Sequence, residues 1–478
     1  MQNPLFLPPQ LRFLNATITA TSSPKDPKTT LYIIIAASLF SIVFFISISS
    51  SSFSSTTTSQ SGLDPFLFPN RQTHRVLFPD TDPSSDPTPP SIAYLISGSA
   101  GDCGRIIRLL LAAYHPRNHY LLHLDLSAPQ SERDALALIV RSLPIFKAAQ
   151  NVNVIGKADF AYPKGSSTIP FTLHGASILL RLSADWDWFV SLNAADYPLV
   201  TQDGTVWLEV LAALCLGIYC SDSGVFIFVS FNSFSDVGFC GFSDLLHILS
   251  FLPKDLNFLN HSSYIGWRES RKLRPIIVYP GLYLSKKTGM FYATQKRELP
   301  NAFQLFTGSS FSILNRYFIE FCILGTDNLP RTLLMYFANT PSSLSNYFAT
   351  VLCNSLQFKR AVINHNLLYV TFDKHSNSEP HLLSSSDYEA MIKSGAAFAR
   401  RFQVDDPVLN RIDQEILGRS AGKVVPSGWC LGESGNHKCS VWGDANVLRP
   451  GPGARRLEKR IVELLSNGTF QSHQCIVE

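Results

Sequence analysis

Residues 91–128 read SIAYLISGSAGDCGRIIRLLLAAYHPRNHYLLHLDLSA, and this stretch decides the fold. β-Forming residues fill 92–96, a Gly/Ser-containing break covers 97–104, and a second β-forming run, 120–124, ends at Asp125. Between the two runs, apolar residues recur at i, i+3, i+4 and i+7, as on one face of a helix: Ile106, Leu109, Leu110 and Ala113. The pattern predicts half of a nucleotide-binding α/β unit, with polar groups at the carboxyl ends of its strands. Any parallel α/β sheet has similar turns, so this stretch alone leaves nucleotide binding open.

Helix and strand patterns keep alternating downstream, which predicts an α/β fold with a mainly parallel central sheet. We expect helices at 129–142, 171–182 and 387–399 and strands at 152–155 and 189–192, with Ser127 as a candidate helix cap.

The composition is that of a protein with one large core and a smaller second domain, because 45% of the 478 residues are hydrophobic and 16% are charged. The formal net charge is only +4, and no long basic run is interleaved with aromatic residues. The sequence therefore gives little support for a nucleic-acid partner.

An uncharged apolar run, LYIIIAASLFSIVFFISI at 31–48, is long enough to cross a bilayer as a helix. Positive charges precede it at Arg12, Lys25 and Lys28, so the positive-inside rule predicts a cytosolic tail at 1–30 and a lumenal body. A cleaved signal peptide is the alternative, but the long leader and the lack of a small-x-small cleavage site favour an uncleaved anchor. Residues 49–90 are rich in Ser, Thr and Pro and predict a disordered stem.

The nine cysteines show no Cys-x-x-Cys spacing typical of zinc sites, so disulfides are expected in an oxidising lumen. Cys430 and Cys439 bracket a Gly-rich turn and form a candidate local pair. Asn260 and Asn467 begin glycosylation sequons on the predicted lumenal side.

The acidic triplet Asp185-Trp-Asp187 stands before the strand at 189–192, whereas Asp196 follows it. A metal-binding Asp-x-Asp is expected after a strand, so the triplet is interpreted as a helix-to-strand corner. Asp196 alone could orient a sugar hydroxyl, but one carboxylate is a poor site for a hard cation.

Three ordered blocks carry a family resemblance: AYHPRNHYLLHLD at 113–125, DWDWFVSLNAADYPLVT at 185–201 and LFTGSSFSILNR at 305–316. Together they resemble the Core-2/I-branching glycosyltransferase family, in particular its plant β-glucuronosyltransferase branch that acts on arabinogalactan. The resemblance implies a GT-A fold, a single-pass type II Golgi membrane protein, a UDP-sugar donor, and inversion without a metal site or other cofactor. It places the catalytic domain at 91–403 and a C-terminal subdomain at 404–478.

The resemblance also implies site residues on the catalytic side of the cleft. The carboxylate base of the family aligns with Ser345, and a second acid of some relatives aligns with Ser310. A serine hydroxyl is not a base near neutral pH, so Asp196 and Asp327 are candidate substitutes. For both acids a structural role, such as capping or pairing with Arg331, is the favoured interpretation.

On the donor side, Ser97 and Gly98 are expected near the nucleotide and Asp125 at the uridine or ribose. Arg401, expected at the end of the helix 387–399, matches the basic phosphate contact of the family. On the acceptor side, Trp267 and Arg268 offer an aromatic platform beside a cation.

Residues 204–243 interrupt the resemblance with an almost uncharged segment rich in Phe, Cys and Gly. Its removal would join Asp203 to Asp244 in the register of the family. A second membrane hairpin is one interpretation; we favour translated non-coding sequence, such as a retained intron.

The resemblance thus implies transfer of glucuronic acid from UDP-glucuronate to β-galactan chains of an arabinogalactan glycoprotein. A xylosyl- or N-acetylglucosaminyltransferase of the same family is the alternative enzyme. A catalytically impaired lumenal protein that binds glycans or a partner is the alternative of another class.

Overall fold

The computed structural model describes residues 89–203, 245–283, 288–373, 376–430, 441–446 and 454–466, with 448, 470, 472, 474 and 475. The chain divides into two compact units, 1–62 and 63–478, and all described residues belong to the second. The expected tail and membrane helix, all but the end of the expected stem, and the segment 204–243 lie outside them. Within the described ranges, no helix is both long and apolar enough to cross a membrane.

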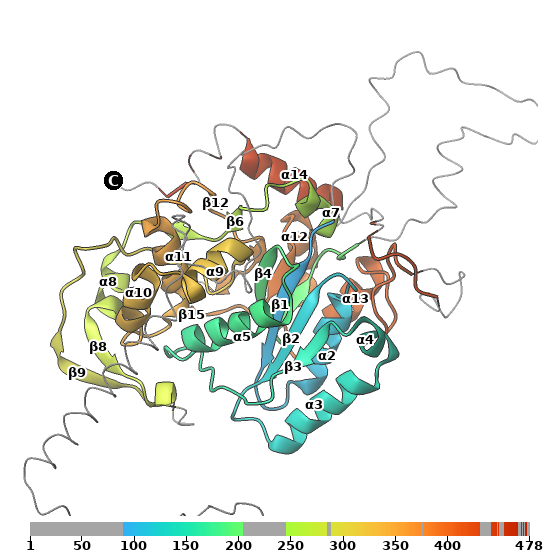
Figure 1. Cartoon of the computed structure of the whole chain (residues 1–478), viewed down its shortest axis with the longest axis horizontal. Coiled ribbons are helices and arrows are strands. Elements are labelled where there is room, and N and C mark those ends of the chain that lie inside the picture. The colour runs from blue at the N-terminus through green and yellow to red at the C-terminus, as the bar shows by residue number, and fades with distance from the viewer. Residues whose placement is uncertain are drawn as a thin grey trace, which may run out of the picture. The chain divides into compact units, whose positions relative to one another are not determined.

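A mixed sheet with strand order β12-β6-β11-β4-β1-β2-β3 forms the centre of the described unit (Figure 1). Its strands are β1 (Ile92–Gly98), β2 (His119–Leu124), β3 (Val152–Val154), β4 (Trp188–Asn193), β6 (Asn257–Phe258), β11 (Ile313–Asn315) and β12 (Val362–Ile363). Only β11 runs against the others in this sheet. The predicted α/β fold with a mainly parallel central sheet is confirmed.

Helices cover both faces of the sheet because alternate residues of each strand point to opposite sides. Tyr94 and Ile96 of β1 pack into one core, and Ala93 and Leu95 pack into the other. The first core contains α2 (Cys103–Ala112), α3 (Gln130–Ser142), α4 (Pro144–Ala149), α7 (Leu245–Ser250), α12 (Tyr388–Lys393), α13 (Pro407–Glu415) and α14 (Ala454–Leu465). The second contains α5 (Thr168–Leu182), α9 (Arg316–Leu324), α10 (Leu329–Phe337) and α11 (Leu344–Asn354).

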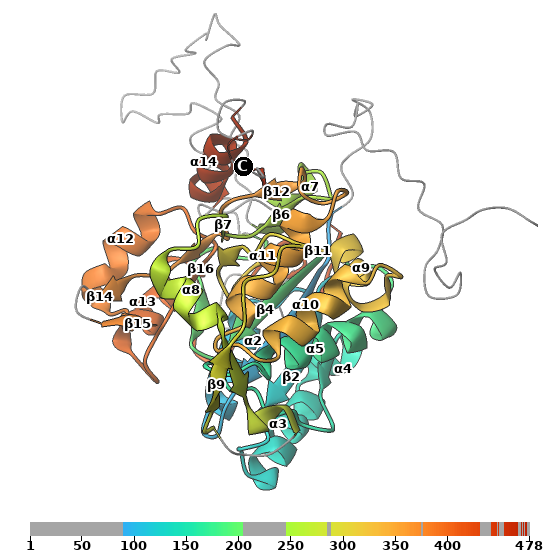
Figure 2. The ribbon, with the colours of Figure 1, turned by 90° about the vertical axis from the view of Figure 1, so that its left-hand side faces the viewer.

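Smaller sheets stand around this framework (Figure 2). One has three strands, β13 (Leu368–Tyr369), β16 (Phe398–Arg400) and β5 (Asp196–Pro198). The two-stranded pairs are β7 (His261–Ser262) with β10 (Thr307–Gly308), β8 (Pro275–Val278) with β9 (Phe291–Lys296), and β14 (Phe372–Asp373) with β15 (Ser376–Pro380). Helix α8 (Trp267–Leu273) and the 3-10 turns η1 (Pro280–Tyr283) and η2 (Ser385–Asp387) complete the described elements.

Two local predictions are wrong. Ser127 does not cap α3: its N–H donates to Asp125, and Pro129 stands at the cap position. The helix expected at 387–399 ends at Lys393, because Gly395 takes a positive φ of 68° that a continuing helix does not allow. The chain then extends into β16, so Arg400 and Arg401 belong to a strand and the residue after it rather than to a helix end.

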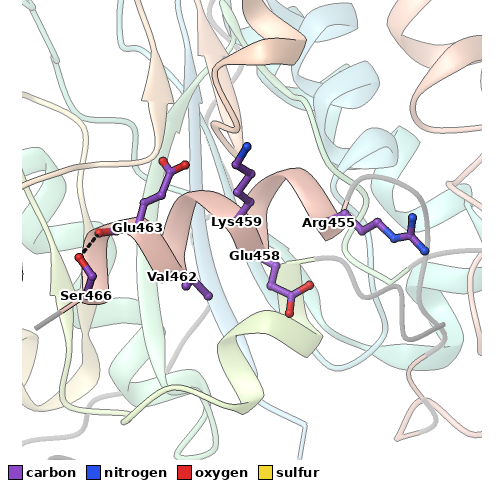
Figure 3. A pocket seen from close by; sticks show the side chains of 6 residues that line it. All are labelled: Arg455, Glu458, Lys459, Val462, Glu463 and Ser466. Atoms are coloured by element: carbon purple, nitrogen blue, oxygen red, sulfur yellow. Dashed lines mark hydrogen bonds between the residues drawn. The ribbon is translucent and has the colours of Figure 1, made fainter. Parts of the chain in front are cut away.

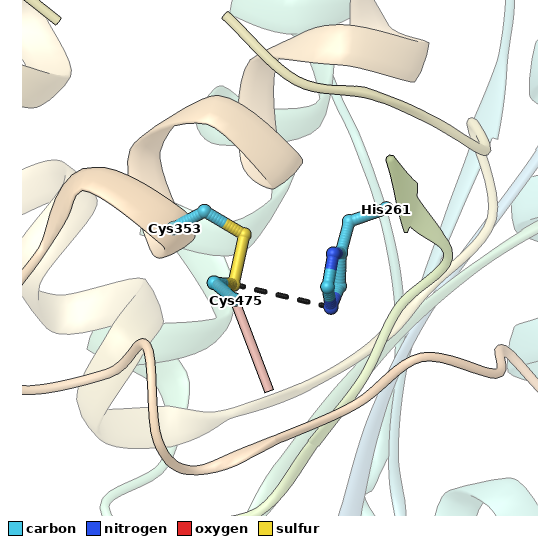
Figure 4. A group of neighbouring side chains, drawn as sticks. All are labelled: His261, Cys353 and Cys475. Carbon is cyan, nitrogen blue, oxygen red and sulfur yellow. Dashed lines mark hydrogen bonds between the residues drawn. A yellow bond between two sulfur atoms is a disulfide. The ribbon is translucent and has the colours of Figure 1, made fainter. Parts of the chain in front are cut away.

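A disulfide joins Cys353 of α11 to Cys475 near the chain end, as expected of the cysteines in general (Figure 4). Cys430 is also disulfide-bonded, but Cys439 lies outside the described residues, so the pairing of these two stays a prediction.

Candidate active site

Three residues predicted on the donor side and the catalytic candidate Asp196 lie at one edge of the sheet. Ser97 and Gly98 end β1, Asp125 follows β2, and Asp196 follows β4. Since β11 runs antiparallel, the residues that precede it, including Ser310, reach the same edge. This edge is where open α/β sheets bind their ligands.

Gly98 lets helix α2 approach the end of β1 closely. A Cβ atom added there would lie 2.7 Å from the Cβ of Asp102, which is too close for two carbon atoms. The Oγ of Ser97 donates a long hydrogen bond of 3.4 Å to the carbonyl of Leu192 on β4. Because the backbone packs closely at this turn, the ends of the strands form the floor of the site, and long side chains do not.

Asp125 is buried and connects two loops through hydrogen bonds. Its two carboxylate oxygens accept from the backbone N–H of Ser127 at 2.7 Å and of Ala161 at 2.6 Å. The residue predicted to contact the uridine or ribose therefore has a structural task that needs no ligand.

The start of α2 is held by a carboxylate of the protein itself. Glu132 of α3 accepts from the N–H groups of Gly101 and Cys103 at 3.0 and 3.1 Å. Helix starts attract anions because their N–H groups and the helix dipole both point outward. In this structure Glu132 takes that place, so positive charge for a diphosphate has to come from elsewhere.

Asp196 and Arg400 form a buried ion pair at the centre of the edge. Strand β16 pairs with β5 and sets Arg400 opposite Asp196. Its Nε and Nη2 donate to the two carboxylate oxygens at 2.5 and 2.6 Å, and its Nη1 donates to the Oγ of Ser310 at 3.2 Å. Burial disfavours the charged form of Arg400. The charge of Asp196 and its hydrogen bonds outweigh this effect, so the pKa of Arg400 is raised.

This pairing limits what Asp196 can do chemically. Its side chain is fully buried, and one of its oxygens also accepts from the backbone N–H of Asn193 at 2.8 Å. A carboxylate whose two oxygens both accept from a guanidinium is not free to accept from a substrate hydroxyl. The structural role favoured for Asp196 fits this geometry, and Arg400 is a site residue that the sequence interpretation missed.

Of the two serines expected at acid positions of the family, Ser310 lies next to this pair. Ser310 bonds Arg400 directly. A Cβ atom added at Gly308 would lie 3.0 Å from the carbonyl oxygen of Ser345, so the first turn of α11 packs against the strand that leads to Ser310. The structure thus places Ser310 at the ion pair and the backbone of Ser345 beside the strand that leads to Ser310.

Arg401 points away from Arg400 and joins a second, exposed charge cluster. Its Nη1 lies 3.0 Å from Oε2 of Glu379, and Nζ of Lys164 lies 3.0 Å from Oε1 of the same carboxylate. Hydrogen bonds from Lys164 and Arg401 and their charges lower the pKa of Glu379. Two cations thus hold one anion. The carbonyl of Lys164 accepts from the N–H of Ser342, just before α11, which puts this charge cluster at the rim of the site.

Other predicted residues lie outside this group. The exposed Asp327 precedes the N-cap residue Asn328 and accepts from the N–H of Leu329, the first residue of α10, which is a structural role. Trp267 is 66% exposed at the start of α8, with the guanidinium of Arg271 5.7 Å from its ring centroid, and Arg268 follows it in the helix. A short chain segment links Trp267 to β7, whose His261 pairs with Gly308.

The corner interpretation of Asp185 and Asp187 is confirmed. Both lie between α5 and β4, at the amino end of β4 and far from the candidate site along that strand. The buried Asp187 accepts from the backbone N–H of Ser91 and pairs with Lys254.

Two further features carry no site chemistry. A hollow of about 630 Å³ lies along α14 and is lined, among the described residues, by that helix and Ser466, which follows it (Figure 3). The buried group His261, Cys353 and Cys475 has ligand types that metals favour, but its two sulfur atoms are joined in the disulfide (Figure 4).

Asn260 lies half-buried directly before β7, and Asn467 lies outside the described residues.

Comparison with known proteins gives a consistent assignment. The family model of the Core-2/I-branching enzymes matches residues 92–208 and 224–392. The β-glucuronosyltransferase GlcAT14A of Arabidopsis thaliana is 45% identical over 394 residues, 82% of this chain and 79% of that protein. GlcAT14B of the same plant is 45% identical over 386 residues, 80% of each chain.

A more distant relative, xylosyltransferase 1 of Rattus norvegicus, is 22% identical over 352 residues, 70% of this chain and 36% of that protein. A family model that matches more than half of the chain, and relatives at 45% identity that cover most of it, agree with each other. The chain therefore belongs to the Core-2/I-branching enzyme family and is a glycosyltransferase.

Proposed function

We propose that the protein is an inverting transferase of GT-A type that moves glucuronic acid from UDP-glucuronate to β-galactan chains of arabinogalactan glycoproteins. The observation that carries the donor choice is the 45% identity over 394 residues to a protein named a β-glucuronosyltransferase. The site supports a nucleotide sugar because polar strand ends and two arginines meet at one sheet edge.

The sugar donor would lie across the carboxyl ends of β1 and β4, with its nucleotide near Ser97 and Gly98 and beside Asp125. Its diphosphate would take the place of the Glu379 carboxylate between Arg401 and Lys164. Two cations can stabilise the charge that develops on the leaving diphosphate, so we expect a metal-independent reaction.

The acceptor side has an aromatic platform, and none of the candidate residues in the described part of the chain is an evident base. We place the galactan chain over Trp267 and Arg268, where an exposed indole can stack on a sugar ring. Its attacking hydroxyl has to lose a proton, but Ser310 and Ser345 carry no carboxylate, and Asp196 is held by Arg400.

A second candidate function follows from these same residues. A lumenal protein that binds UDP-sugars or glycans, with impaired transfer, would need the donor contacts but no base. Xylose and N-acetylglucosamine are the alternative donor sugars, and a xylosyltransferase stands among the distant relatives.

We propose a type II topology in the Golgi membrane, with 31–48 as the anchor, 49–90 as the stem, and Asn260 and Asn467 glycosylated in the lumen. The apolar run of the sequence supports the anchor. The disulfide between Cys353 and Cys475 supports an oxidising compartment.

The test is a UDP-release assay with UDP-glucuronate and a β-galactan acceptor on the wild type, Ser345→Glu and the uncharged control Ser345→Gln. We expect slow release by the wild type and a rate about 100-fold higher for Ser345→Glu, the scale of general-base catalysis. Ser345→Gln should match the wild type. Equal, fast release by all three would show that position 345 is not the base site, and UDP-sugar binding without release by any of them would favour the second candidate.

A further inference from the structure

Helix α7 begins with hydrogen bonds that cross the segment 204–243. The N–H of Leu245 donates to the carbonyl of Thr201 at 3.2 Å, and the N–H of Leu246 donates to the carbonyl of Gln202 at 3.1 Å. In an α-helix each N–H donates to the carbonyl four residues earlier. If Asp203 were bonded directly to Asp244, Leu245 and Leu246 would be the fourth residues after Thr201 and Gln202. Two successive bonds therefore have the register of one continuous helix.

The residues before the segment are fixed in the core. Oε1 of Gln202 accepts from the hydroxyl of Tyr94 at 2.7 Å and from Nδ2 of Asn118 at 3.0 Å. Oδ2 of Asp203 accepts from the N–H of Gly428 at 2.6 Å. Both side chains are 2% exposed, so this flank is an interior part of the fold rather than a surface loop.

The residues after the segment are fixed as firmly. Leu245, Leu246 and Leu249 have no exposed surface and belong to the same core cluster as Leu457 and Ile461 of α14. Figure 1 shows α7 beside α14, in agreement with the contacts between the two helices. Helix α7 thus joins the turn at Thr201 to the core against which α14 packs.

Insertions that natural proteins tolerate fall at exposed loop tips with few backbone bonds. This one falls inside a buried helical turn. Its sequence is almost uncharged and rich in Phe, Cys and Gly, and the match to the family model breaks within it: residues 204–208 and 224–243 are matched and 209–223 are skipped.

We propose that the functional enzyme is the chain in which Asp203 joins Asp244, so that 201–250 forms one continuous turn and helix. The segment 204–243 is then not a part of the functional protein, and the fold neither needs it nor assigns it a role. This inference concerns the architecture and does not depend on the sugar donor or the acceptor.

The test compares three proteins: the full chain, Δ204–243, and the register-shifted control Δ204–244. The control removes one more residue, which turns α7 by about 100° and moves its leucines off the core. We expect Δ204–243 to give a higher soluble yield and a Tm about 5 °C above that of the full chain, because no long loop has to be closed within a helix. The control should melt below Δ204–243.

The inference is overturned if Δ204–243 melts no higher than the register-shifted control, or if it fails to fold while the full chain folds. Sequencing of messenger RNA across this joint gives a second, independent result. We expect most transcripts to join codon 203 to codon 244, and a majority that carries the segment would contradict the proposal. Neither measurement involves sugar transfer. A failure of the proposed transfer in an activity assay is therefore a separate outcome.

Discussion

The ion pair of Asp196 and Arg400 is the most constrained feature of the site at the scale of single residues. Breaking a buried pair leaves an uncompensated charge, so we expect Arg400→Gln to lower the free energy of unfolding by about 3 kcal/mol. The double variant Arg400→Gln with Asp196→Asn should lose less than the sum of the single losses. Denaturant unfolding measures all three variants, and additive losses would show that the two side chains do not stabilise each other.

The Glu379 carboxylate gives a second prediction at this scale. If it competes with the diphosphate for Arg401 and Lys164, Glu379→Gln should raise the affinity for UDP about 3-fold, a small change because exposed ion pairs are weak. Arg401→Met should lower it. The control Glu389→Gln removes an equal charge at an exposed residue that pairs with Arg411. Calorimetric Kd values that are equal for Glu379→Gln and Glu389→Gln would contradict the competition.

Single residues also show where sequence reasoning reached its limit. Asp196 could be placed after a strand from the pattern alone, and the serines at 310 and 345 could be placed by family alignment. Arg400 and its partners could not, because the run Ala396-Ala397-Phe398-Ala399 has a helical composition and only tertiary pairing with β5 makes it a strand. Lys164 lies in a turn and Glu379 in β15, and no local pattern connects the two.

At the scale of elements, the disulfide between α11 and the chain end gives a prediction about stability. The two cysteines close a sequence separation of 122 residues, and the cross-link restricts the unfolded chain. We expect Cys353→Ser to lower the free energy of unfolding by about 3 kcal/mol. Cys103→Ser, which changes an unpaired and partly exposed cysteine, is the matched control and should have a small effect. Equal unfolding free energies for the two variants would show that the cross-link does not stabilise the fold.

The elements with strong periodicity were the predictable ones. The unit from β1 through α2 to β2 has four apolar residues on one helix face between two unbroken β-forming runs, and each was found as expected. The expected helix 387–399 failed where a single glycine at 395 reversed the backbone. Short strands such as β6 and β12, of two residues each, are set by the sheet they join and leave no periodic signal.

At the scale of the whole molecule, buried neutral histidines predict sensitivity to acid. Burial lowers the pKa of His123 from 6.5 to about 4; nearby acids only partly oppose this, and its Nε2 accepts from the N–H of Asp159. In the unfolded chain His123 binds a proton below about pH 6.5, whereas in the folded chain it does so only below about pH 4. The free energy of unfolding therefore falls as the pH drops through this window.

We expect His123 to account for a loss of about 2 kcal/mol of unfolding free energy between pH 7 and pH 5. His123→Gln keeps an acceptor for Asp159 and should remove this part of the pH dependence. His381→Gln, at a half-buried histidine, is the control and should retain it. Denaturant unfolding at both pH values measures the difference, and an unchanged slope in His123→Gln would contradict the assignment.

The central claim, transfer of glucuronic acid to a β-galactan, is tested most directly by one competition assay. The protein is incubated with a β-galactan oligosaccharide and equal amounts of UDP-glucuronate, UDP-xylose and UDP-N-acetylglucosamine, and the product is identified by mass spectrometry. We predict an acceptor extended by glucuronic acid alone. An acceptor extended by xylose or N-acetylglucosamine, or one left unchanged while UDP-glucuronate binds, would contradict the claim.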